Sequence, residues 1–451
     1  MPAFAAGVSR SLSSGAESLR GTLGGWTWAP ALAVAKPAVL ALLSRVDTGT
    51  LLLVDEPGET RHVFGQRLSS EPGGVELSTG LPRRATSVPR VEIVVKNDAF
   101  WMRLFLFADM GFAEAYMLGD FQCEDLTSFF RLFIVNRDHM NNGTTWISSL
   151  SSIASTMARS TNTLSNALLN ISAHYDISND MFAAFLSPDM TYSCPIWQQA
   201  SGTEPREESL EEAQITKLNR FIDGAKIKPT DHVLEIGTGW GSFALEAVRR
   251  TGCRVTSLTL SKEQKALAEE RIAAAGFCDR IEVKLMDYRE LPVPPQPFDK
   301  IVSIEMLEAV GQEYLATYFK CVDRLLKKDG GIAMFQCITM PESRHEVYSK
   351  SEDQQSAGSL IVENIENIGG HYARTLRLWN EKFQENFNDA IKPALLKEHP
   401  DLTKAGVEVF RRKWEYYFTY CEAGFVSKTL GDVIITVGRE GALELMEGIP
   451  L

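Results

Sequence analysis

The stretch LEIGTGWGSFALEA, residues 234–247, joins an apolar run typical of a buried strand to a pattern typical of a helix. Its glycines Gly237, Gly239 and Gly241 occupy alternate positions, and glycine permits the positive φ angles and close backbone approach that a ligand-binding turn requires. The amides of such a loop and of the following helix start form a cradle for an anionic group. A plain tight turn is the alternative interpretation.

The spacing of the glycines indicates which ligand this cradle would hold. It is not the G-x-G-x-x-G pattern, in which the third glycine allows close helix packing beside a pyrophosphate. The pattern E-x-G-x-G-x-G, which begins at Glu235 and includes Thr238, suits a nucleoside that carries a carboxylate, S-adenosylmethionine. We therefore predict a cofactor site at this junction of strand and helix.

Alternating strand and helix patterns extend from residue 213 towards the C-terminus. Apolar runs bounded by turn residues predict strands at 231–237, 254–260, 281–287, 298–306 and 330–340, with helices at 242–250, 261–276 and 312–327. That alternation predicts a parallel sheet covered on both faces. Two further strand-like runs within 424–440 lie so close together that they must pair antiparallel. The expected fold is α/β and Rossmann-like, a seven-stranded sheet with an antiparallel C-terminal strand.

The ends of the second and third predicted strands supply further candidate cofactor contacts. An acid commonly ends the second strand in enzymes of this class and binds the ribose hydroxyls, but here that position carries none. Thr259, Ser261 and Gln264 offer hydroxyl and amide groups there instead, and Leu260 between them is a further candidate cofactor contact. Asp287 and Tyr288 follow the third strand and are placed for the amino group and ring face of adenine; a helix cap is the alternative role for Asp287.

The N-terminal part shows a different pattern, which predicts a smaller α+β domain. Residues 48–65 read as a β-hairpin with a Pro-Gly turn, and 90–97 as another strand. Residues 100–136 are dense in Phe, Leu and Met and predict helices over an apolar surface. An ordinary core is the main interpretation of that region and a lipid-facing cap is the alternative. Residues 141–172 keep helical spacing and predict a connector helix.

The composition is that of a globular protein, with 44% hydrophobic and 23% charged residues. A net charge of −12 argues against nucleic-acid binding, which requires a basic field, but does not exclude a membrane surface. The seven cysteines form no C-x-x-C pair or metal-ligating cluster, which indicates a reducing compartment and no metal site.

The apolar stretch 26–44 is broken by prolines and Lys36 and predicts no transmembrane span. Residues 1–25 read as a flexible N-terminus, with a weak organelle presequence as the alternative.

Several stretches, taken in order, resemble the cyclopropane-fatty-acyl-phospholipid synthase family, which includes the mycolic acid methyltransferases. They are HYDISNDMFAAFLSPDMTYSCPIW (174–197), VLEIGTGWG (233–241), LTLSKEQ (258–264), EMLEAVG (305–311), ENIGGHYARTLRLW (366–379) and WEYYFTYCEAGFVSKTLGDV (414–433). The resemblance implies a flexible N-terminus with a short apolar helix (1–44), a lipid-binding-like domain (45–140), the connector helix (141–172) and an S-adenosylmethionine-dependent methyltransferase domain (173–451).

The resemblance also implies chemistry on an unactivated alkene in a phospholipid acyl chain. The π electrons attack the sulfonium methyl group, and a base then removes a proton from the added methyl so that a cyclopropane ring closes. Water must be excluded, because it would trap the carbocation. The family uses bound bicarbonate as that base. The implied cofactors are therefore S-adenosylmethionine and bicarbonate, and the product is a cyclopropane or methyl-branched acyl chain.

The resemblance assigns the bicarbonate site to the Cys194 backbone, Glu308, Ile338 and Tyr372. Gln336 stands near it, where bacterial members of the family place a histidine. An amide can donate to bicarbonate but cannot take its proton, so the bacterial proton relay does not carry over.

Other residues take roles around this site. By the same resemblance, Tyr192 and Ser193 would lie near the sulfonium and the carboxylate of the cofactor, and Tyr175 would line the same region. Glu305 stands three residues before Glu308, where a predicted strand ends. It would support the bicarbonate site or cap the following turn, because acids favour a helix start.

A second departure from the family follows VYSKSED (347–353). The chain passes directly to QQSAGSLIVENIENIGG, without the aromatic segment and Phe-Pro-Gly-Gly turn that family members carry there. That segment helps to wall the pocket. Its loss would leave a more open site, a different substrate or an inactive protein.

The leading hypothesis is an enzyme that methylates unsaturated acyl chains of phospholipids. It would be cytoplasmic and peripheral at membranes, with mitochondrial targeting and a homodimer left open. A sphingolipid or small-molecule methyltransferase on the same scaffold is the first alternative. An N-methyltransferase would prefer a histidine close after Glu308, where Ala309 follows. An inactive lipid-binding relative is the second alternative.

Overall fold

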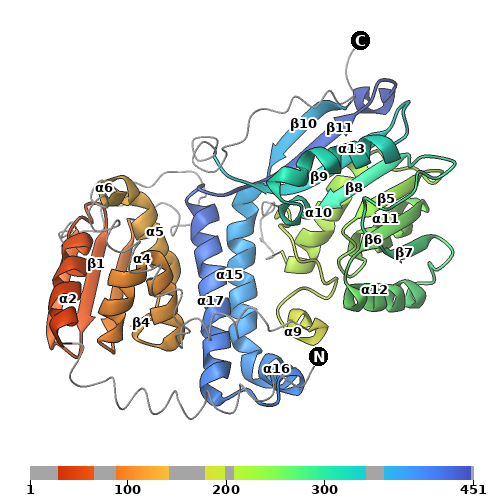
Figure 1. The fold of residues 1–451 in the computed structure, drawn as a ribbon. Coiled ribbons are helices and arrows are strands. Elements are labelled where there is room, and N and C mark those ends of the chain that lie inside the picture. Colours follow the sequence, from red (N-terminus) through yellow and green to blue (C-terminus); the bar gives the residue numbers. More distant parts are fainter. Residues whose placement is uncertain (1–28, 66–87, 142–177, 199–207, 342–359, 448–451) are drawn as a thin grey trace, which may run out of the picture. The chain divides into compact units, whose positions relative to one another are not determined.

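The computed structural model describes residues 29–65, 88–141, 178–198, 208–341 and 360–447 (Figure 1). The chain divides into two compact units: residues 1–176 with 399–423, and residues 177–398 with 424–451. The sequence did not indicate that 399–423 group with the N-terminal residues. Tyr175 and, beyond its first residue, the predicted connector helix lie outside the described residues.

The first unit contains a four-stranded sheet in the order β2-β1-β3-β4. β1 (Thr50–Asp55) pairs antiparallel with β2 (Thr60–Gly65), which confirms the predicted hairpin. β3 (Arg90–Val95), also predicted, lies parallel to β1 and pairs antiparallel with the short β4 (Phe121–Cys123), which the sequence did not indicate. Every second side chain of β1 and β3 is buried, and those between them are half-buried in β1 and mostly exposed in β3, so one face of this sheet is covered.

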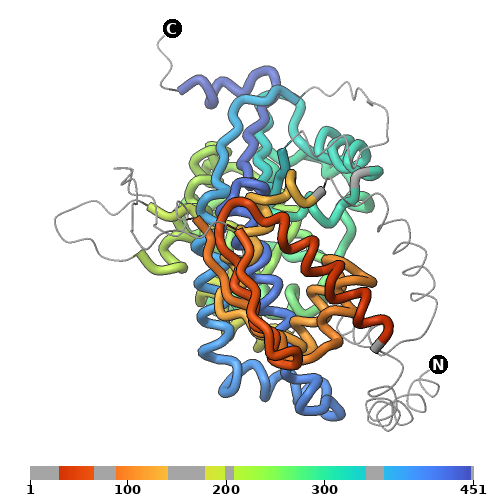
Figure 2. The backbone as a smooth tube through the Cα atoms, turned by 90° about the vertical axis from the view of Figure 1, so that its left-hand side faces the viewer, coloured from red at the N-terminus to blue at the C-terminus, as the bar shows by residue number. Residues whose placement is uncertain are grey.

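Helices cover that face. They are α2 (Ala29–Leu43), α4 (Ala99–Leu118), α5 (Leu126–Val135) and the short α6 (Arg137–Asn141), and α2 packs along α4 (Figure 2). Asp125 begins α5, because its carboxylate accepts the Ser128 amide at 2.9 Å. Phe100, Phe121 and Phe129 are buried in the core of this unit, which confirms the core interpretation of the Phe-rich region.

The second unit contains the predicted seven-stranded sheet, in the order β10-β11-β9-β8-β5-β6-β7. Its strands are β5 (His232–Ile236), β6 (Arg254–Thr259), β7 (Ile281–Leu285), β8 (Lys300–Ile304), β9 (Ile332–Thr339), β10 (Ile361–Asn367) and β11 (Gly431–Gly438). β5 to β9 are parallel, and β11 pairs antiparallel with both β9 and β10. The α/β fold with an antiparallel C-terminal strand is thus confirmed.

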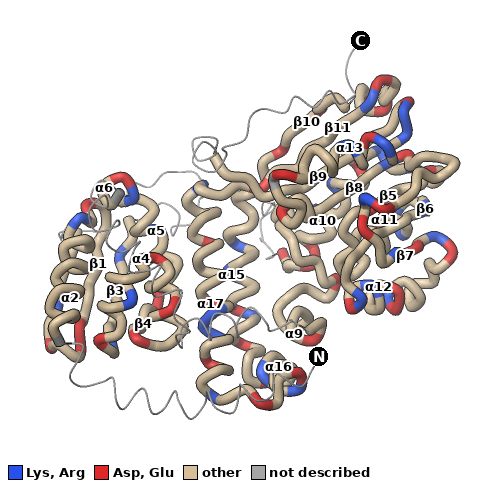
Figure 3. The backbone as a smooth tube through the Cα atoms, in the orientation of Figure 1, with Lys and Arg blue, Asp and Glu red and all other residues tan. Residues whose placement is uncertain are grey.

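The helices of the second unit flank this sheet. They are α9 (Asn179–Ala183), α10 (Leu210–Gly224), α11 (Ser242–Thr251), α12 (Lys262–Ala274), α13 (Leu315–Leu325), α15 (Gly369–Glu385) and α16 (Lys392–Glu398). Single turns of other helix types occupy Leu307–Ala309, Gln312–Tyr314, Phe387–Ile391 and Leu443–Met446. Lys and Arg alternate with Asp and Glu along α12 (Figure 3). Fewer charged side chains are buried inside the unit than lie on its surface, and several of the buried ones belong to the site described below. No described helix in either unit has the length and apolar character of a membrane span.

The prediction of two strands within 424–440 is wrong for the first of them. Gly424–Val426 end α17 (Lys404–Val426), and only β11 is a strand. Ion pairs between neighbouring turns, Arg411 with Glu408 at 2.7 Å and with Glu415 at 3.4 Å, favour the helix. The close antiparallel partner of β11 is therefore β10, not the run before it.

The order of the strands determines where a ligand would lie. From β5 the chain proceeds outward through β6 and β7, then returns to place β8 on the other side of β5. In open α/β sheets such a reversal opens a crevice at the carboxyl ends of the two strands. The glycine loop follows β5, and Glu305 and Glu308 follow β8, so the predicted cofactor loop and the predicted bicarbonate-binding carboxylate both lie at this edge.

Candidate active site

The glycine loop leaves β5 with three residues in the left-handed region. φ is +104° at Gly237, +52° at Gly239 and +87° at Gly241. The amides of Gly237 and Thr238 both donate to the Leu258 carbonyl at 3.0 Å, which fixes the loop to β6. A Cβ added at Gly239 would meet no heavy atom within 4 Å. Backbone that faces open space at a helix start is suited to a polar ligand.

Glu235 lies beneath this loop, inside the sheet, where it is only 3% exposed. Its carboxyl accepts a hydrogen bond from Ser257, whose Oγ is also 2.6 Å from Thr238 Oγ1. Burial raises the pKa of Glu235 to about 8, so the side chain is mostly neutral at pH 7. The structure therefore places this predicted cofactor residue where it supports the loop through Ser257.

The residues predicted at the end of β6 bond to one another. Thr259 Oγ1 donates to Gln264 Oε1 at 2.8 Å and accepts the Ser261 amide at 3.1 Å. Ser261 in turn caps α12 by accepting the Gln264 amide at 3.1 Å. Leu260 between them is 74% exposed, so this turn presents an apolar side chain at the sheet edge.

Asp287 and Tyr288 follow β7, as predicted. The Asp287 carboxylate accepts from the Arg289 guanidinium at 2.6 and 2.9 Å and from the Arg289 amide at 2.9 Å. The guanidinium lowers the pKa of Asp287 and keeps it ionised. The Tyr288 ring is half-buried and meets the Tyr318 ring edge-on at 5.1 Å. Asp287 thus organises its own turn, which favours the capping role, while Tyr288 retains an accessible part.

Glu305, at the end of β8, joins elements that are far apart in the sequence. Its Oε1 accepts from the Cys194 amide and from Gln336 Nε2, both at 2.7 Å, and its Oε2 accepts from the Tyr372 hydroxyl at 2.7 Å. Gln336 Nε2 also lies 2.9 Å from Asp432 Oδ2. The partners belong to the segment before α10, to β9 and to α15, so the carboxylate is fixed from three directions.

The backbone of Glu305 is unusual. Its φ is +46°, a value that residues with a side chain rarely adopt and that often marks functional sites. The following turn, Leu307–Ala309, has no side-chain cap. The interpretation of Glu305 as a cap is therefore wrong, because its carboxylate points to Cys194 and Tyr372 instead.

Glu308 is exposed, and its Oε1 accepts the Ile338 amide at 2.6 Å. The structure therefore divides the predicted bicarbonate ligands into two groups. Cys194 and Tyr372 donate to Glu305, whereas Ile338 donates to Glu308.

Burial governs the charges around Glu305. Burial raises the pKa of Glu305, and it raises that of Asp432 to about 10, with the negative charge of Glu305 as the next cause. Asp432 is therefore a neutral acid at pH 7. Lys217 is fully buried and donates to Ser193 Oγ at 2.7 Å. Burial lowers the pKa of Lys217, while Glu305 and other acids oppose that shift.

Aromatic rings line the same region of the second unit. The Tyr192 ring lies 5.0 Å from Trp379 and 5.2 Å from Phe182, and the Tyr372 ring lies 4.6 Å from Phe425 and 5.9 Å from Trp379. Aromatic faces stabilise a nearby cation and exclude water. Both properties suit chemistry that passes through a carbocation.

The sequence analysis did not single out Asp432 or Lys217, although each left a signal. Asp432 opens the apolar strand run DVIITV, where an acid is costly unless it has a role. Lys217 stands four residues after Ala213 and four before Phe221, on the apolar face of α10. A charged residue in an apolar stripe indicates a buried polar contact.

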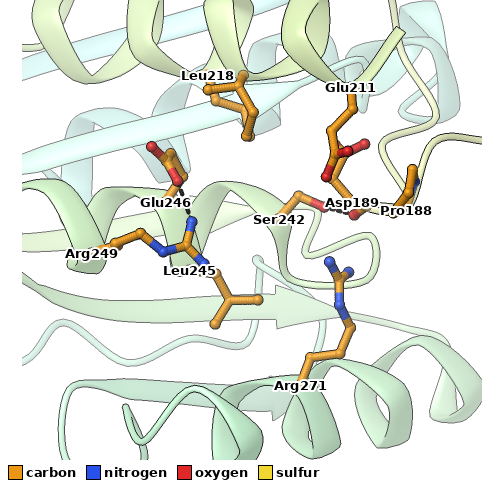
Figure 4. Close-up of a pocket in the computed structure, with 10 residues that line it drawn as sticks. Pro188, Asp189, Glu211, Leu218, Ser242, Leu245, Glu246, Arg249 and Arg271 are labelled. Carbon is orange, nitrogen blue, oxygen red and sulfur yellow. Dashed lines mark hydrogen bonds and ion pairs between the residues drawn. The ribbon is translucent and has the colours of Figure 1, made fainter. Parts of the chain in front are cut away.

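A separate cavity of 130 Å³ lies beside α11 (Figure 4). Asp189, Glu211, Ser242 and Arg271 gather around it, and Ser242 donates to the Asp189 carbonyl. None of the predicted site residues lines this cavity. It is distinct from the group around Glu305.

A seven-stranded sheet with this strand order and a glycine loop after its first parallel strand are typical of an S-adenosylmethionine-dependent methyltransferase. The family model described as mycolic acid cyclopropane synthetase matches residues 162–354 and 348–434. The chain belongs to this family. The two matched pieces meet at 348–354, the place where the sequence departs from the family pattern.

Comparisons with individual proteins support that assignment. The chain is 35% identical to the tuberculostearic acid methyltransferase UfaA1 of Mycobacterium tuberculosis over 375 residues, which are 77% of this chain and 82% of that protein. It is 29% identical to the cyclopropane-fatty-acyl-phospholipid synthase of Escherichia coli over 382 residues, 78% of this chain and 90% of that one. A coclaurine N-methyltransferase structure is similar with a TM-score of 0.53 at 18% identity, covering 74% of this chain and 99% of that one. The last likeness shows the fold alone.

Proposed function

We propose that this protein transfers a methyl group from S-adenosylmethionine to the double bond of an unsaturated phospholipid acyl chain, and that the product is a cyclopropane or methyl-branched chain. The observation that carries the proposal is the carboxylate of Glu305, fixed by Cys194 and Tyr372 beside aromatic rings at the switch point of the sheet. The similar proteins named above, a tuberculostearic acid methyltransferase and a cyclopropane-fatty-acyl-phospholipid synthase, support the substrate class.

The described residues fit S-adenosylmethionine. The glycine loop has open space above Gly239, and the start of α11 faces the same side, so backbone amides can receive the carboxylate of the cofactor. Tyr288 retains accessible ring surface for the adenine. The cofactor would supply an electrophilic methyl group, and the protein would orient it and exclude water.

The fit to bicarbonate is poor. The Cys194 amide and the Tyr372 hydroxyl donate to Glu305, and the Ile338 amide donates to Glu308. The donors that would hold the anion therefore have partners in the protein. Two carboxylates close by would also repel a further negative charge.

The acyl chain would approach along the carboxyl edge of the sheet. Four apolar side chains stand exposed there, at or just beyond the ends of β6, β7 and β9: Leu260, Leu285, Ile338 and Met340. Phospholipid acyl chains lie within a membrane, so we infer peripheral contact through this edge. Most aromatic side chains of the Phe-rich region, among them Phe100, Phe112 and Phe129, are buried in the core of the first unit and do not supply that surface.

Two alternative functions are tested beside this one. The first is methyl transfer to a sphingolipid or a small molecule, which would use the same fold. The missing segment after Asp353 admits an inactive lipid-binding protein. Against an inactive protein, the glycine loop and the cluster of aromatic rings around Tyr192 and Tyr372 are both formed.

The test uses the purified full chain, labelled S-adenosylmethionine and vesicles of unsaturated or fully saturated phospholipid. We expect label in the unsaturated lipid alone, with the acyl chain heavier by one methylene unit in mass spectrometry. The protein should sediment with the vesicles and be released by carbonate. Transfer to an amine or sphingolipid, but not to phospholipid, would establish the first alternative. Lipid binding without transfer would establish the second.

Gly239→Val should lower the affinity for S-adenosylmethionine at least tenfold in calorimetry, because a branched side chain would occupy the open space above the loop. Gly252→Val is the matched control. Gly252 also has positive φ, +76°, and open space around its Cβ, but it ends α11 at the opposite side. If both variants lose affinity equally, backbone strain and not the ligand site explains the loss.

A further inference from the structure

The Glu305 carboxylate occupies the position that the family resemblance gives to bicarbonate. A bicarbonate bound by the Cys194 amide and the Tyr372 hydroxyl would present one oxygen to each. Glu305 presents Oε1 to the amide and Oε2 to the hydroxyl, each at 2.7 Å. Carboxylate and bicarbonate share the same planar pair of acceptor oxygens. The side chain therefore satisfies donors that would otherwise need an anion from solution.

Gln336 completes this arrangement. Its Nε2 donates to Glu305 Oε1 at 2.7 Å and lies 3.2 Å from the Cys194 carbonyl. The residue is fully buried, so this amide is held in place. Bacterial members have a histidine at this position, which can exchange a proton with an anion. An amide cannot, but it can hold a carboxylate that remains attached to the chain.

We propose that the Glu305 carboxylate itself removes the proton from the added methyl group, in place of bound bicarbonate. The inference rests on the proposed function and names the base of that reaction. A C–H bond of the added methyl breaks, and its electron pair forms the carbon–carbon bond that closes the ring on the cationic carbon. The proton goes to a Glu305 oxygen and then to solvent. No further oxidant or reductant is needed.

The surroundings of Glu305 suit this role. A base must be ionised before the reaction and basic enough to take a proton. Three donors hold the ionised form, whereas burial raises the pKa above its usual range and so increases basicity. The titratable residues that contact Glu305 or influence its pKa are Cys194, Lys217, Tyr372 and Asp432. Cys337 interacts electrostatically with Glu305, and Glu308 interacts with Asp432. Lys217 favours the ionised form, and the neutral acid Asp432 adds no charge at pH 7.

The test compares Glu305→Gly with Glu305→Gln in buffer with and without bicarbonate. Glycine suits the positive φ at this position and opens a space of carboxylate size, whereas glutamine fills the space without charge. We expect the wild-type rate to be independent of bicarbonate. Both variants should lose activity by about 10²–10⁴, the usual effect of removing a positioned base. Added bicarbonate should restore activity to Glu305→Gly at least tenfold and should not restore Glu305→Gln.

A binding measurement decides the question without turnover. Isotopically labelled bicarbonate observed by NMR should broaden with Glu305→Gly and remain sharp with wild type and with Glu305→Gln. Bicarbonate binding by wild type, or a wild-type rate that rises and saturates with bicarbonate, would overturn the proposal. If wild type transfers no methyl group to any lipid, the proposed function fails, and this binding pattern still tests the position of the carboxylate.

The pH profile gives a second readout, which stands even if Glu305→Gly does not fold. Because the base must be ionised, activity should fall as pH falls through the raised pKa of Glu305. The hydroxyl of Tyr372 lowers that pKa by its hydrogen bond. Tyr372→Phe should therefore move the acid limb of the profile to higher pH. An unchanged limb would contradict the assignment of the limb to Glu305.

Discussion

Glu305→Gln is expected to lower the turnover of methyl transfer by about 10²–10⁴, which corresponds to about 2.7–5.4 kcal/mol of activation free energy. The amide keeps the shape of the side chain and one acceptor oxygen, but it cannot take a proton. Its NH₂ group would also face the donors of Cys194 or Tyr372, which lie at 2.7 Å. Cofactor affinity in calorimetry should stay nearly unchanged, because the glycine loop lies after a different strand.

The matched control is Glu308→Gln, the same substitution three residues later. Glu308 is exposed, and its contact with the Ile338 amide needs only an acceptor oxygen, which glutamine retains. The hydrogen bond is worth about 0.5–1.5 kcal/mol, so turnover should stay within about tenfold of wild type. A larger loss for Glu308→Gln than for Glu305→Gln would return the central role to Glu308, as the family resemblance implies.

The sequence indicated most of the methyltransferase sheet because its signals are local. The apolar run before Gly237 and the glycine spacing after it specify a strand, a turn and a helix within a few residues, and the same holds for the runs that became β6 to β9. The error at Gly424–Val426 arose for the opposite reason. A short apolar run reads alike in a strand and at a helix end, and this run is the end of a long helix that begins at Lys404.

The sequence predicted which residues form the site, but not how these residues contact one another. Cys194, Gln336 and Tyr372 were named from the resemblance, and the structure brings them together. What a strand-end acid does depends on the backbone, and the positive φ of Glu305 cannot be read from its neighbours. An acid before a turn looks like a cap until the donor from Cys194, 111 residues away in the chain, is known.

The grouping of 399–423 with the N-terminal residues also depends on contacts between residues that are far apart in the sequence. Tyr416 of α17 lies 5.1 Å from Phe130 and 6.4 Å from Phe112, ring to ring. Glu422 accepts the Thr127 hydroxyl at 3.0 Å in a buried position. No local pattern in α17 indicates these partners, because each lies about 300 residues earlier in the chain.

Phe112→Ala is expected to lower the free energy of unfolding of the first unit by about 3–5 kcal/mol, the usual range for a buried Phe. The Phe112 ring stacks on Phe129 with centroids 4.4 Å apart and an angle of 2° between the planes, and it lies 4.7 Å from Phe121. Removing it leaves a cavity among rings that cannot all close over it. Hydrogen exchange of amides in β1 and β3 would report the loss for this unit alone.

Met110→Ala is the matched control on the same helix, since Met110 is 54% exposed. An exposed substitution of this kind changes stability by about 0.5 kcal/mol or less.

The pair of variants also separates the two interpretations of the Phe-rich region, an ordinary core and a lipid-facing cap. In a core, Phe112→Ala destabilises the unit, and neither variant alters sedimentation with vesicles under conditions where the protein remains folded. In a lipid-facing cap, vesicle binding would fall for both variants while exchange in β1 and β3 stayed as in wild type. That outcome would contradict the core assignment and move the membrane contact from the sheet edge to this unit.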